Sequence, residues 1–282
     1  MTTSTVAETA NAYIVSLTDV SARDVSVVGN KATNLGELMR AGMLVPKGCV
    51  LTTYAFRHFL KMNHISADAS FETVTNARIP DVIATTLFDA TVRLGDLPLA
   101  VRSSSSAEDL TDASFAGQYE TLLNVRGGEE LFKAVLCCWS SAFNDRVRSY
   151  QRMQDTTVVP DMALLIQVMI PADASGVAFS VNPVSGDRDE AVVSAVRGLG
   201  ERLVSGQVSP DEWFVKGRVA TCLSSPEDAI TAEQAQQIAA MARKAEAHFG
   251  TPQDIEWAIS RDRAYLLQSR PITTLRRPLC QK

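Results

Sequence analysis

The segment from Ala100 to Asn124 most constrains what this chain can fold into. It reads AVRSSSSAEDLTDASFAGQYETLLN and places an arginine, four successive serines and a Gly-Gln pair between two apolar runs. Arginine offers a rigid fork of donors that matches phosphate oxygens, and serine hydroxyls and closely approaching backbone amides supply further donors. A loop so rich in small donors suits an oligophosphate better than a hydrophobic core. Composition alone leaves an alternative open, which is a polar surface loop whose arginine, Arg102, forms a salt bridge.

Length and composition are those of an ordinary soluble globular protein. The 282 residues can bury a large core, and the chain is 46% hydrophobic and 21% charged. A net charge of −5 argues against a nucleic-acid or acidic-membrane partner. The five cysteines are odd in number and form no CxxC pair, which favours reduced thiols. We find no secretion signal and no apolar run near the ~20 residues of a spanning helix, so we expect a cytoplasmic protein.

Hydrophobic periodicity predicts mainly helices in the first half of the chain and mainly strands in the second. The expected helices are residues 31–41, 54–63, 80–94, 129–154 and 232–249, and the expected strands are residues 13–17, 99–102, 162–170, 176–181, 191–196 and 212–215. A last hairpin joins residues 255–259 to 264–268. Thr231 and Gly250 are suited to begin and end the helix between them, and residues 1–10 are expected to be disordered. This order fits an α+β architecture of two lobes with a nucleotide between them.

The segment VRSSSSAEDLTDASFAGQYET resembles the phosphate-binding segment in the ATP-binding domain of the pyruvate phosphate dikinase and phosphoenolpyruvate synthase family. Rifampicin phosphotransferases share that domain. The resemblance implies an ATP-grasp fold, with a phosphate-binding lobe at residues 1–165 and a lobe for the adenine hinge and metal at residues 166–282. It also implies that Arg102 grips phosphate and that Gly117 and Gln118 belong to a mobile loop over the triphosphate. Two acidic residues in the segment are better explained by helix capping or arginine pairing than by metal binding: Glu108 and Asp109.

A second segment, VGNKATNLGELMRAGMLVPKG, contains a lysine at the mouth of a predicted helix. The ammonium of Lys31 could meet a phosphate beside the helix amides, although an isolated lysine there is more often solvated. The segment resembles the family's VGGKGANLGEL…AGL.VPPGF, whose lysine contacts ATP phosphates. Asn30 and Thr33 replace usual glycine or alanine positions. Because asparagine tolerates positive φ better than most residues, we expect the turn to be kept.

A third segment, ALLIQVMIPADASGVAFSVNPVSG, contains an apolar strand that ends in Gln167, Val168 and Met169. The end of such a strand can offer backbone donors and acceptors to a purine edge, with the methionine covering the ring. A buried strand beside a hairpin is the alternative. The segment resembles the family's hinge, VVVQ.MV…SGVAFT.NP, and this resemblance assigns adenine binding to the three residues.

The fourth segment, PQDIEWAISRDRAYLLQSRPI, forms the predicted C-terminal hairpin. Glu256 and Gln268 lie on its two strands, so their oxygens could converge on one cation, and Arg270 follows on the same face. Mg²⁺ needs few protein oxygens when phosphates and water supply the rest, and a neighbouring arginine can neutralise charge during phosphoryl transfer. An exposed carboxylate and glutamine are the alternative. The segment resembles DIEWA…LLQ.RPIT, which implies that the glutamate and glutamine bind metal and that the arginine touches phosphate.

One motif of the family is missing. Members use ATP to phosphorylate a histidine on a swivelling domain with a signature like GG..SH.A, whereas the three histidines here, His58, His64 and His248, match no such motif. The sequence also ends just after the nucleotide-binding module would end. We therefore expect the ATP-binding part of a split dikinase-like phosphotransferase, using Mg²⁺ and ATP and releasing AMP. Its catalytic residues would be Lys31, Arg102 and Arg270.

The expected partners are a separate phosphohistidine swivelling-domain protein, a protein that binds the acceptor substrate, and a small-molecule phosphoryl acceptor. No nucleic acid or membrane is expected. Two alternatives stay open at this point. One is a self-sufficient ATP-grasp kinase or ligase that acts directly on a small molecule, and the other is a non-catalytic nucleotide-binding regulatory module.

Overall fold

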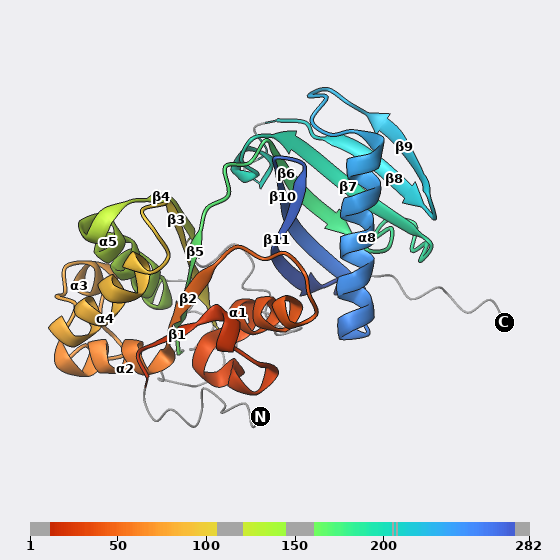
Figure 1. Cartoon of the computed structure of the whole chain (residues 1–282). Coiled ribbons are helices and arrows are strands. Elements are labelled where there is room, and N and C mark those ends of the chain that lie inside the picture. The colour runs from red at the N-terminus through yellow and green to blue at the C-terminus, as the bar shows by residue number, and fades with distance from the viewer. Residues whose placement is uncertain (1–11, 106–120, 145–160, 205, 207, 274–282) are drawn as a thin grey trace. The chain divides into compact units, whose positions relative to one another are not determined.

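The computed structural model describes residues 12–105, 121–144, 161–204, 206 and 208–273 (Figure 1). The chain divides into two compact units, residues 1–37 with 47–169 and residues 38–46 with 170–282. The sequence-based division placed a single boundary after residue 165. In the structure the main boundary follows Met169, and the short stretch 38–46 belongs to the second unit.

The first unit is built on a five-stranded antiparallel sheet with the strand order β1-β2-β5-β3-β4. Its strands are β1 (Ile14–Ser16), β2 (Gly48–Leu51), β3 (Leu99–Ser104), β4 (Thr121–Val125) and β5 (Ala163–Val168). Its helices are α1 (Val25–Arg40), whose last residues fall in the second unit, α2 (Thr53–Met62), α3 (Phe71–Thr75), α4 (Asp81–Val92) and α5 (Gly127–Ser140). Figure 1 shows α2 to α5 gathered on one side of this sheet.

Alternation along the strands divides the side chains of this sheet between two faces. One face packs with α2, α4 and α5 into the core, where Trp139 lies with its ring centroid 4.6 Å from that of Phe59 and 5.7 Å from that of Phe56. The strand residues of this core face are Cys49, Leu51, Leu99, Val101, Val125, Leu164, Ile166 and Val168. The residues between them, including Arg102, therefore belong to the opposite face.

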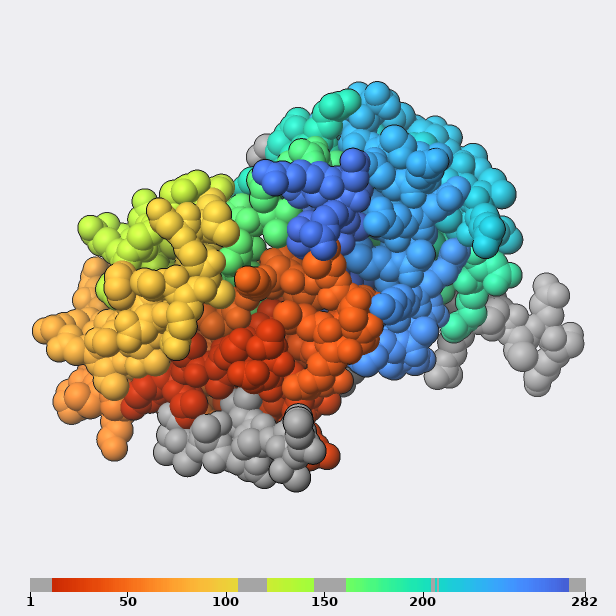
Figure 2. Space-filling model, viewed as in Figure 1, coloured from red at the N-terminus to blue at the C-terminus, as the bar shows by residue number. Residues whose placement is uncertain are grey.

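The second unit is a six-stranded antiparallel sheet in the order β11-β10-β6-β7-β8-β9. Its elements are β6 (Ala174–Phe179), β7 (Glu190–Arg197), α7 (Glu201–Val204), β8 (Asp211–Lys216), β9 (Val219–Ser224), α8 (Ala232–Phe249), β10 (Gln253–Ser260) and β11 (Arg263–Pro271). Helix α8 packs along the sheet through a buried stripe of small residues and Ile238, and its other side forms part of the blue surface in Figure 2.

The predicted α+β class and most long elements are confirmed. The Thr231 hydroxyl accepts a hydrogen bond from the Gln234 backbone N–H at 3.2 Å, and Gly250 ends α8 with φ of 72°. The helix expected to run to residue 154 ends at Ser140, because a 3₁₀ turn (Ser141–Phe143) follows it. The Ser141 hydroxyl donates to the Cys138 carbonyl, a local bond that competes with helix continuation. Residues 145–154 and 1–10 lie outside the described part of the chain.

The thiol and membrane expectations can be compared with the described residues. Cys49, Cys137, Cys138 and Cys222 are free thiols, and burial raises the pKa of Cys49 to about 12; Cys280 lies outside the described part. No helix within that part has the length and hydropathy that crossing a membrane requires.

Substituting Gly176→Ala tests how closely two backbones approach in the second sheet. A Cβ at Gly176 would lie 1.9 Å from the Ser194 carbonyl oxygen of β7, so we expect a loss of roughly 1–3 kcal/mol or more in the free energy of unfolding. Urea denaturation measures this loss. Gly128→Ala is the control, because its nearest neighbour would be 3.8 Å away. Equal stability of the two variants would contradict the packing.

Candidate functional site

Lys31 lies in α1 just after a break in that helix. Gly29 has φ of 75° and ψ of 170°, values that no helical residue adopts, so the helix restarts after it. The expected turn is present, but Asn30 is not among the residues with positive φ, so its tolerance for that region is not used. Thr33 donates its hydroxyl to the Gly29 carbonyl at 2.8 Å. The Lys31 ammonium donates to the Ser103 carbonyl at 3.0 Å.

Most side chains of the serine run are buried. Ser103, Ser104 and Ser105 are all buried. The Ser104 hydroxyl donates to the Val28 carbonyl at 2.8 Å, and the Ser105 hydroxyl donates to the Asp161 carbonyl at 3.3 Å. These two hydroxyls, which the sequence suggested as phosphate donors, are therefore already used within the protein.

Arg102 and Gln167 lie on the same face of the first sheet. Arg102 pairs with Leu165, and Ala100 pairs with Gln167, so the two polar residues are diagonal neighbours on adjacent strands. Arg102 is half-buried and Gln167 is buried. Gly48 pairs with Gln167 from the other side, and a Cβ there would come within 2.9 Å of the Gln167 side chain. Glycine at this position leaves room for the glutamine.

The predicted adenine hinge lies at the end of β5, a central strand whose two edges are both paired. The Val168 N–H donates to the Lys47 carbonyl at 2.9 Å, and the Met169 N–H donates to the Pro98 carbonyl at 2.8 Å. Both backbone donors expected for a purine are thus used by the first unit. Adenine recognition by this stretch stays a prediction, and it would need other groups of the same residues.

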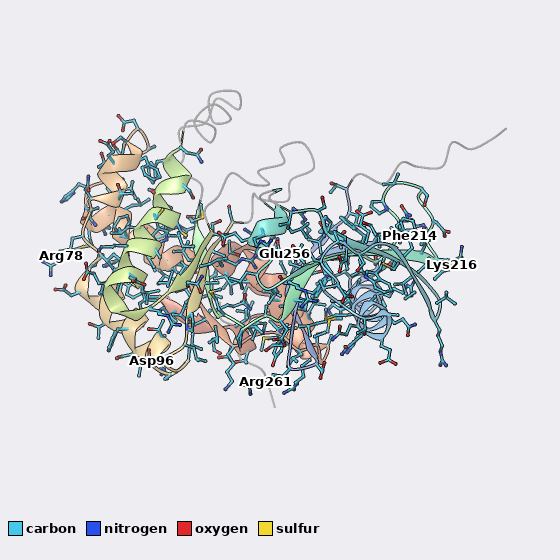
Figure 3. All side chains as sticks on the ribbon, turned by 90° about the horizontal axis from the view of Figure 1, so that it is seen from above. Arg78, Asp96, Phe214, Lys216, Glu256 and Arg261 are labelled. Atoms are coloured by element: carbon cyan, nitrogen blue, oxygen red, sulfur yellow. The ribbon has the colours of Figure 1, made fainter. Side chains whose placement is uncertain are left out.

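The C-terminal hairpin brings together the residues predicted to bind metal. Glu256 on β10 is the direct cross-strand partner of Gln268 on β11, and Figure 3 labels Glu256 in the second unit. Directly paired residues lie on the same face of a sheet. A two-residue turn with φ of 48° at Arg261 and 59° at Asp262 closes the hairpin, as left-handed turns do between twisted strands. Carboxylate and amide oxygens in this arrangement are hard ligands of the kind that Mg²⁺ prefers.

Asp254 fixes the orientation of Arg270. The arginine Nε and Nη2 atoms each lie 2.8 Å from Asp254 Oδ2, and the carboxylate side chain is only 9% exposed. Burial raises the pKa of Asp254 above its ordinary value, the charge of Arg270 opposes this shift, and Glu256 adds to it. Asp254 was not among the predicted site residues. Its alternation with Glu256 along one strand was the available signal.

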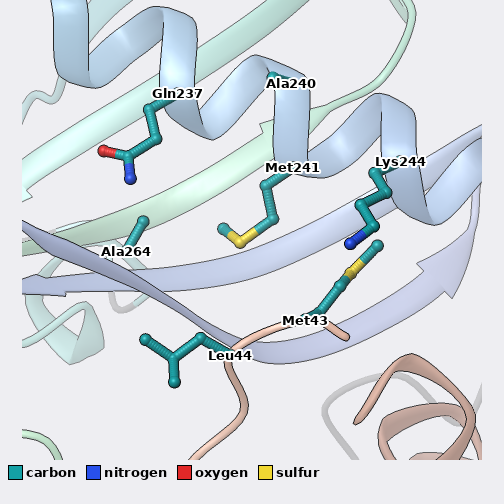
Figure 4. A pocket seen from close by; sticks show the side chains of 7 residues that line it. All are labelled: Met43, Leu44, Gln237, Ala240, Met241, Lys244 and Ala264. Atoms are coloured by element: carbon teal, nitrogen blue, oxygen red, sulfur yellow. The ribbon is translucent and has the colours of Figure 1, made fainter. Parts of the chain in front are cut away.

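Four residues considered for the site, Glu108, Asp109, Gly117 and Gln118, lie outside the described part of the chain. A shallow pocket in the second unit is a different feature (Figure 4). Residues of α8, β11 and the 38–46 stretch line it: Met43, Leu44, Gln237, Ala240, Met241, Lys244 and Ala264. Ala264 pairs with Ile259, which places it on the α8 side of the sheet, away from the face of Glu256.

The pKa shift of Asp254 gives a stability prediction with a definite sign. A carboxyl whose pKa is raised by folding stabilises the native state below its ordinary pKa, about 4, and this contribution is lost as pH rises through the raised value. We expect the stability of the native protein relative to Asp254→Asn to fall from about pH 4 to pH 7 in urea titrations.

Asp187→Asn is the control for this prediction. The Lys216 ammonium lowers the pKa of Asp187, so the native protein should gain stability relative to this variant as the pH rises. Parallel pH profiles for the two variants would show that burial of Asp254 does not control its titration.

Comparison with known proteins bears on all four segments. Residues 25–225 and 223–280 match the family described as pyruvate phosphate dikinase, AMP/ATP-binding domain. The chain is 38% identical to a rifampicin phosphotransferase of Streptomyces over 93% of its length and 36% of the relative's. It is 33% identical to a probable phosphoenolpyruvate synthase of Methanocaldococcus jannaschii over 94% of its length and 27% of the relative's. The chain thus spans about a third of the length of these curated relatives.

Two solved structures are distantly similar. They are an N5-carboxyaminoimidazole ribonucleotide synthetase in complex with ADP, at 12% identity and a TM-score of 0.45, and a D-alanine–D-alanine ligase of Bacillus anthracis in complex with ATP, at 11% identity and a TM-score of 0.41. They cover 86% and 87% of this chain, and the matches span 45% and 55% of theirs. The α+β class follows from the two sheets and their helices, and the ATP-grasp assignment rests on the family. The chain belongs to the pyruvate phosphate dikinase AMP/ATP-binding domain family.

Proposed function

We propose that this chain binds Mg²⁺ and ATP and transfers the β-phosphoryl group to a histidine on a separate swivelling-domain protein, while the γ-phosphoryl group passes to water or inorganic phosphate and AMP is released. The phosphoryl group on the histidine then passes to a small-molecule acceptor. The observation that carries the proposal is the polar end of the β10–β11 hairpin, where Glu256 faces Gln268 and Arg270 is held by Asp254. Membership of an AMP/ATP-binding family supports the choice of nucleotide.

Three cations would contact the phosphates. Lys31 and Arg102 belong to the first unit, and Arg270 belongs to the second. The Lys31 ammonium donates to the Ser103 carbonyl, and the Arg270 guanidinium makes two contacts with the Asp254 carboxylate. Arg102 is oriented by its position on β3. Phosphoryl transfer needs little covalent help from a protein, so fixed positions and charge neutralisation would supply most of the rate.

Glu256 and Gln268 would hold Mg²⁺. Their side chains offer a carboxylate and an amide oxygen from directly opposed positions, and the nearby Asp254 is committed to Arg270. When bound, the ion would neutralise phosphate charge. The donor set suits this ion, which is commonly bound through one or two carboxylates together with phosphates and water.

The acceptor histidine is proposed to lie on another protein, because the contacts of the histidines in this chain are those of packing residues. The His58 Nδ1 atom lies 3.1 Å from the Tyr13 hydroxyl, and its ring packs against the tyrosine ring. The His248 ring centroid lies 5.0 Å from that of Phe249 at the end of α8. His64 follows α2 with φ of 52°. None stands beside Lys31, Arg102 or Arg270 in sequence.

The proposed transfer is tested with β- and γ-labelled ATP and candidate proteins that carry a GG..SH.A motif. We expect β-label on a partner histidine and AMP as the nucleotide product. No labelled histidine with any candidate encoded near this gene would contradict the proposal. ATP consumption that depends on a small molecule and needs no partner would instead identify a self-sufficient enzyme. Binding of ATP without turnover under all these conditions would identify a regulatory module.

Glu256→Gln separates metal binding from nucleotide binding. We expect the affinity of the variant for ATP in the presence of Mg²⁺ to fall by about 10- to 100-fold, because losses of this size follow even from changes around metal ligands. Its affinity for ATP in EDTA should stay the same. Isothermal titration calorimetry with and without Mg²⁺ measures both. Glu212→Gln is the control, since Glu212 is an exposed glutamate on β8 of the same sheet. If Mg²⁺ raises the ATP affinity of Glu256→Gln as much as that of the native protein, Glu256 is not a metal ligand.

A further inference from the structure

The end of β3 caps the part of α1 that carries Lys31. Gly29 breaks the helix at this point, and the first N–H groups of a helix need acceptors from outside it. The Ala32 N–H donates to the Ser104 hydroxyl at 3.3 Å, and the Asn30 N–H donates to the Ser105 carbonyl at 3.4 Å. The Ser104 hydroxyl in turn donates to the Val28 carbonyl at 2.8 Å. A serine more than 70 residues away thus takes the role of an N-cap.

The contact between α1 and β3 has no space for adjustment. A Cβ at Gly29 would lie 2.2 Å from the Ser104 carbonyl oxygen and 2.5 Å from the Ser104 hydroxyl oxygen. The backbone of the helix break therefore rests directly on Ser104. The Ser104 hydroxyl donates to Val28 before the break and accepts from Ala32 after it, and these two bonds fix the register of the helix against the strand.

The contact of Ser104 with the helix break, called the joint below, connects the two positively charged residues that are proposed to bind phosphate in the first unit. Arg102 precedes Ser104 by two residues on β3, so both belong to the same face of the sheet. Lys31 lies between the two helix residues bonded to the joint, Asn30 and Ala32, and its ammonium donates to the Ser103 carbonyl at 3.0 Å. A shift of the helix along the strand would change the spacing of the two positive charges.

We propose that Ser104 is a positioning residue, which sets Lys31 against Arg102 through the helix that it caps. The inference rests on the proposed function, because it assumes that these two cations bind phosphate. It gives the serine run a different role from the one its composition suggests. The buried hydroxyl of Ser104 organises the phosphate-binding cations and is not itself a phosphate ligand.

The test is Ser104→Ala, which removes both hydroxyl bonds without adding volume. We expect ATP affinity to fall by about tenfold or more, because an ångström-scale misplacement has large effects at such sites, while adenosine affinity stays the same. Adenosine lacks phosphates, so general damage to the fold would weaken both ligands. Ser140→Ala is the matched control, since this buried hydroxyl of α5 donates to the Cys137 carbonyl of its own helix at 2.7 Å.

A double-mutant cycle with Lys31→Ala identifies the route of the effect. We expect Ser104→Ala to add little to the loss of ATP affinity once Lys31 is absent. Fully additive losses, or equal losses for ATP and adenosine, would overturn the positioning role. If Ser104→Ala does not fold in thermal unfolding, Ser104→Cys carries the same test with a weaker hydrogen-bonding group.

The two proposals fail in different ways. If Lys31→Ala and Arg102→Ala leave ATP affinity unchanged, the proposed phosphate contacts are wrong. If these variants weaken ATP binding and both Ser104→Ala and Ser104→Cys do not, only the positioning role of Ser104 is wrong.

Discussion

The pairing of β5 between β2 and β3 is the constraint on which the first unit depends. Antiparallel register decides which side chains face the helical core, and a slip of one residue would exchange the two faces. In the observed register Ile166 lies between Cys49 and Val101 in the core. The same register turns Arg102 and Gln167 to the other face. Burial of ordinary apolar side chains therefore holds two polar side chains in place.

The second unit uses charge in a comparable way. A buried carboxylate is costly, and the raised pKa of Asp254 reflects that cost. The positive charge of Arg270 offsets part of this cost, and Arg270 is itself held by two contacts of 2.8 Å to Oδ2 of Asp254. An arginine fixed before a ligand arrives loses less entropy on binding than a mobile one. The Asp254–Arg270 pair thus supports preorganisation at some expense in stability.

Much of this arrangement could be predicted from sequence because it depends on local pattern. The facing of Glu256 and Gln268 follows from one hairpin with a two-residue turn, and α8 follows from its periodicity and the caps at Thr231 and Gly250. The role of Ser104 could not be predicted, because its helix partner lies more than 70 residues away. A run of serines looks alike in sequence whether its hydroxyls meet a ligand or another part of the chain.

The serine run and the predicted hinge share a physical feature. At both places the backbone or hydroxyl donors that composition assigned to a ligand are bonded within the first unit, as the N–H groups of Val168 and Met169 show. Because these donors are hydrogen-bonded within the protein, they hold the strands and the helix break in fixed positions. In the proposed function, ligand contact falls to charged side chains, above all Lys31 and Arg102. Charged side chains suit phosphate because an ammonium or guanidinium neutralises its negative charge as well as donating hydrogen bonds, and arginine can bind two phosphate oxygens at once.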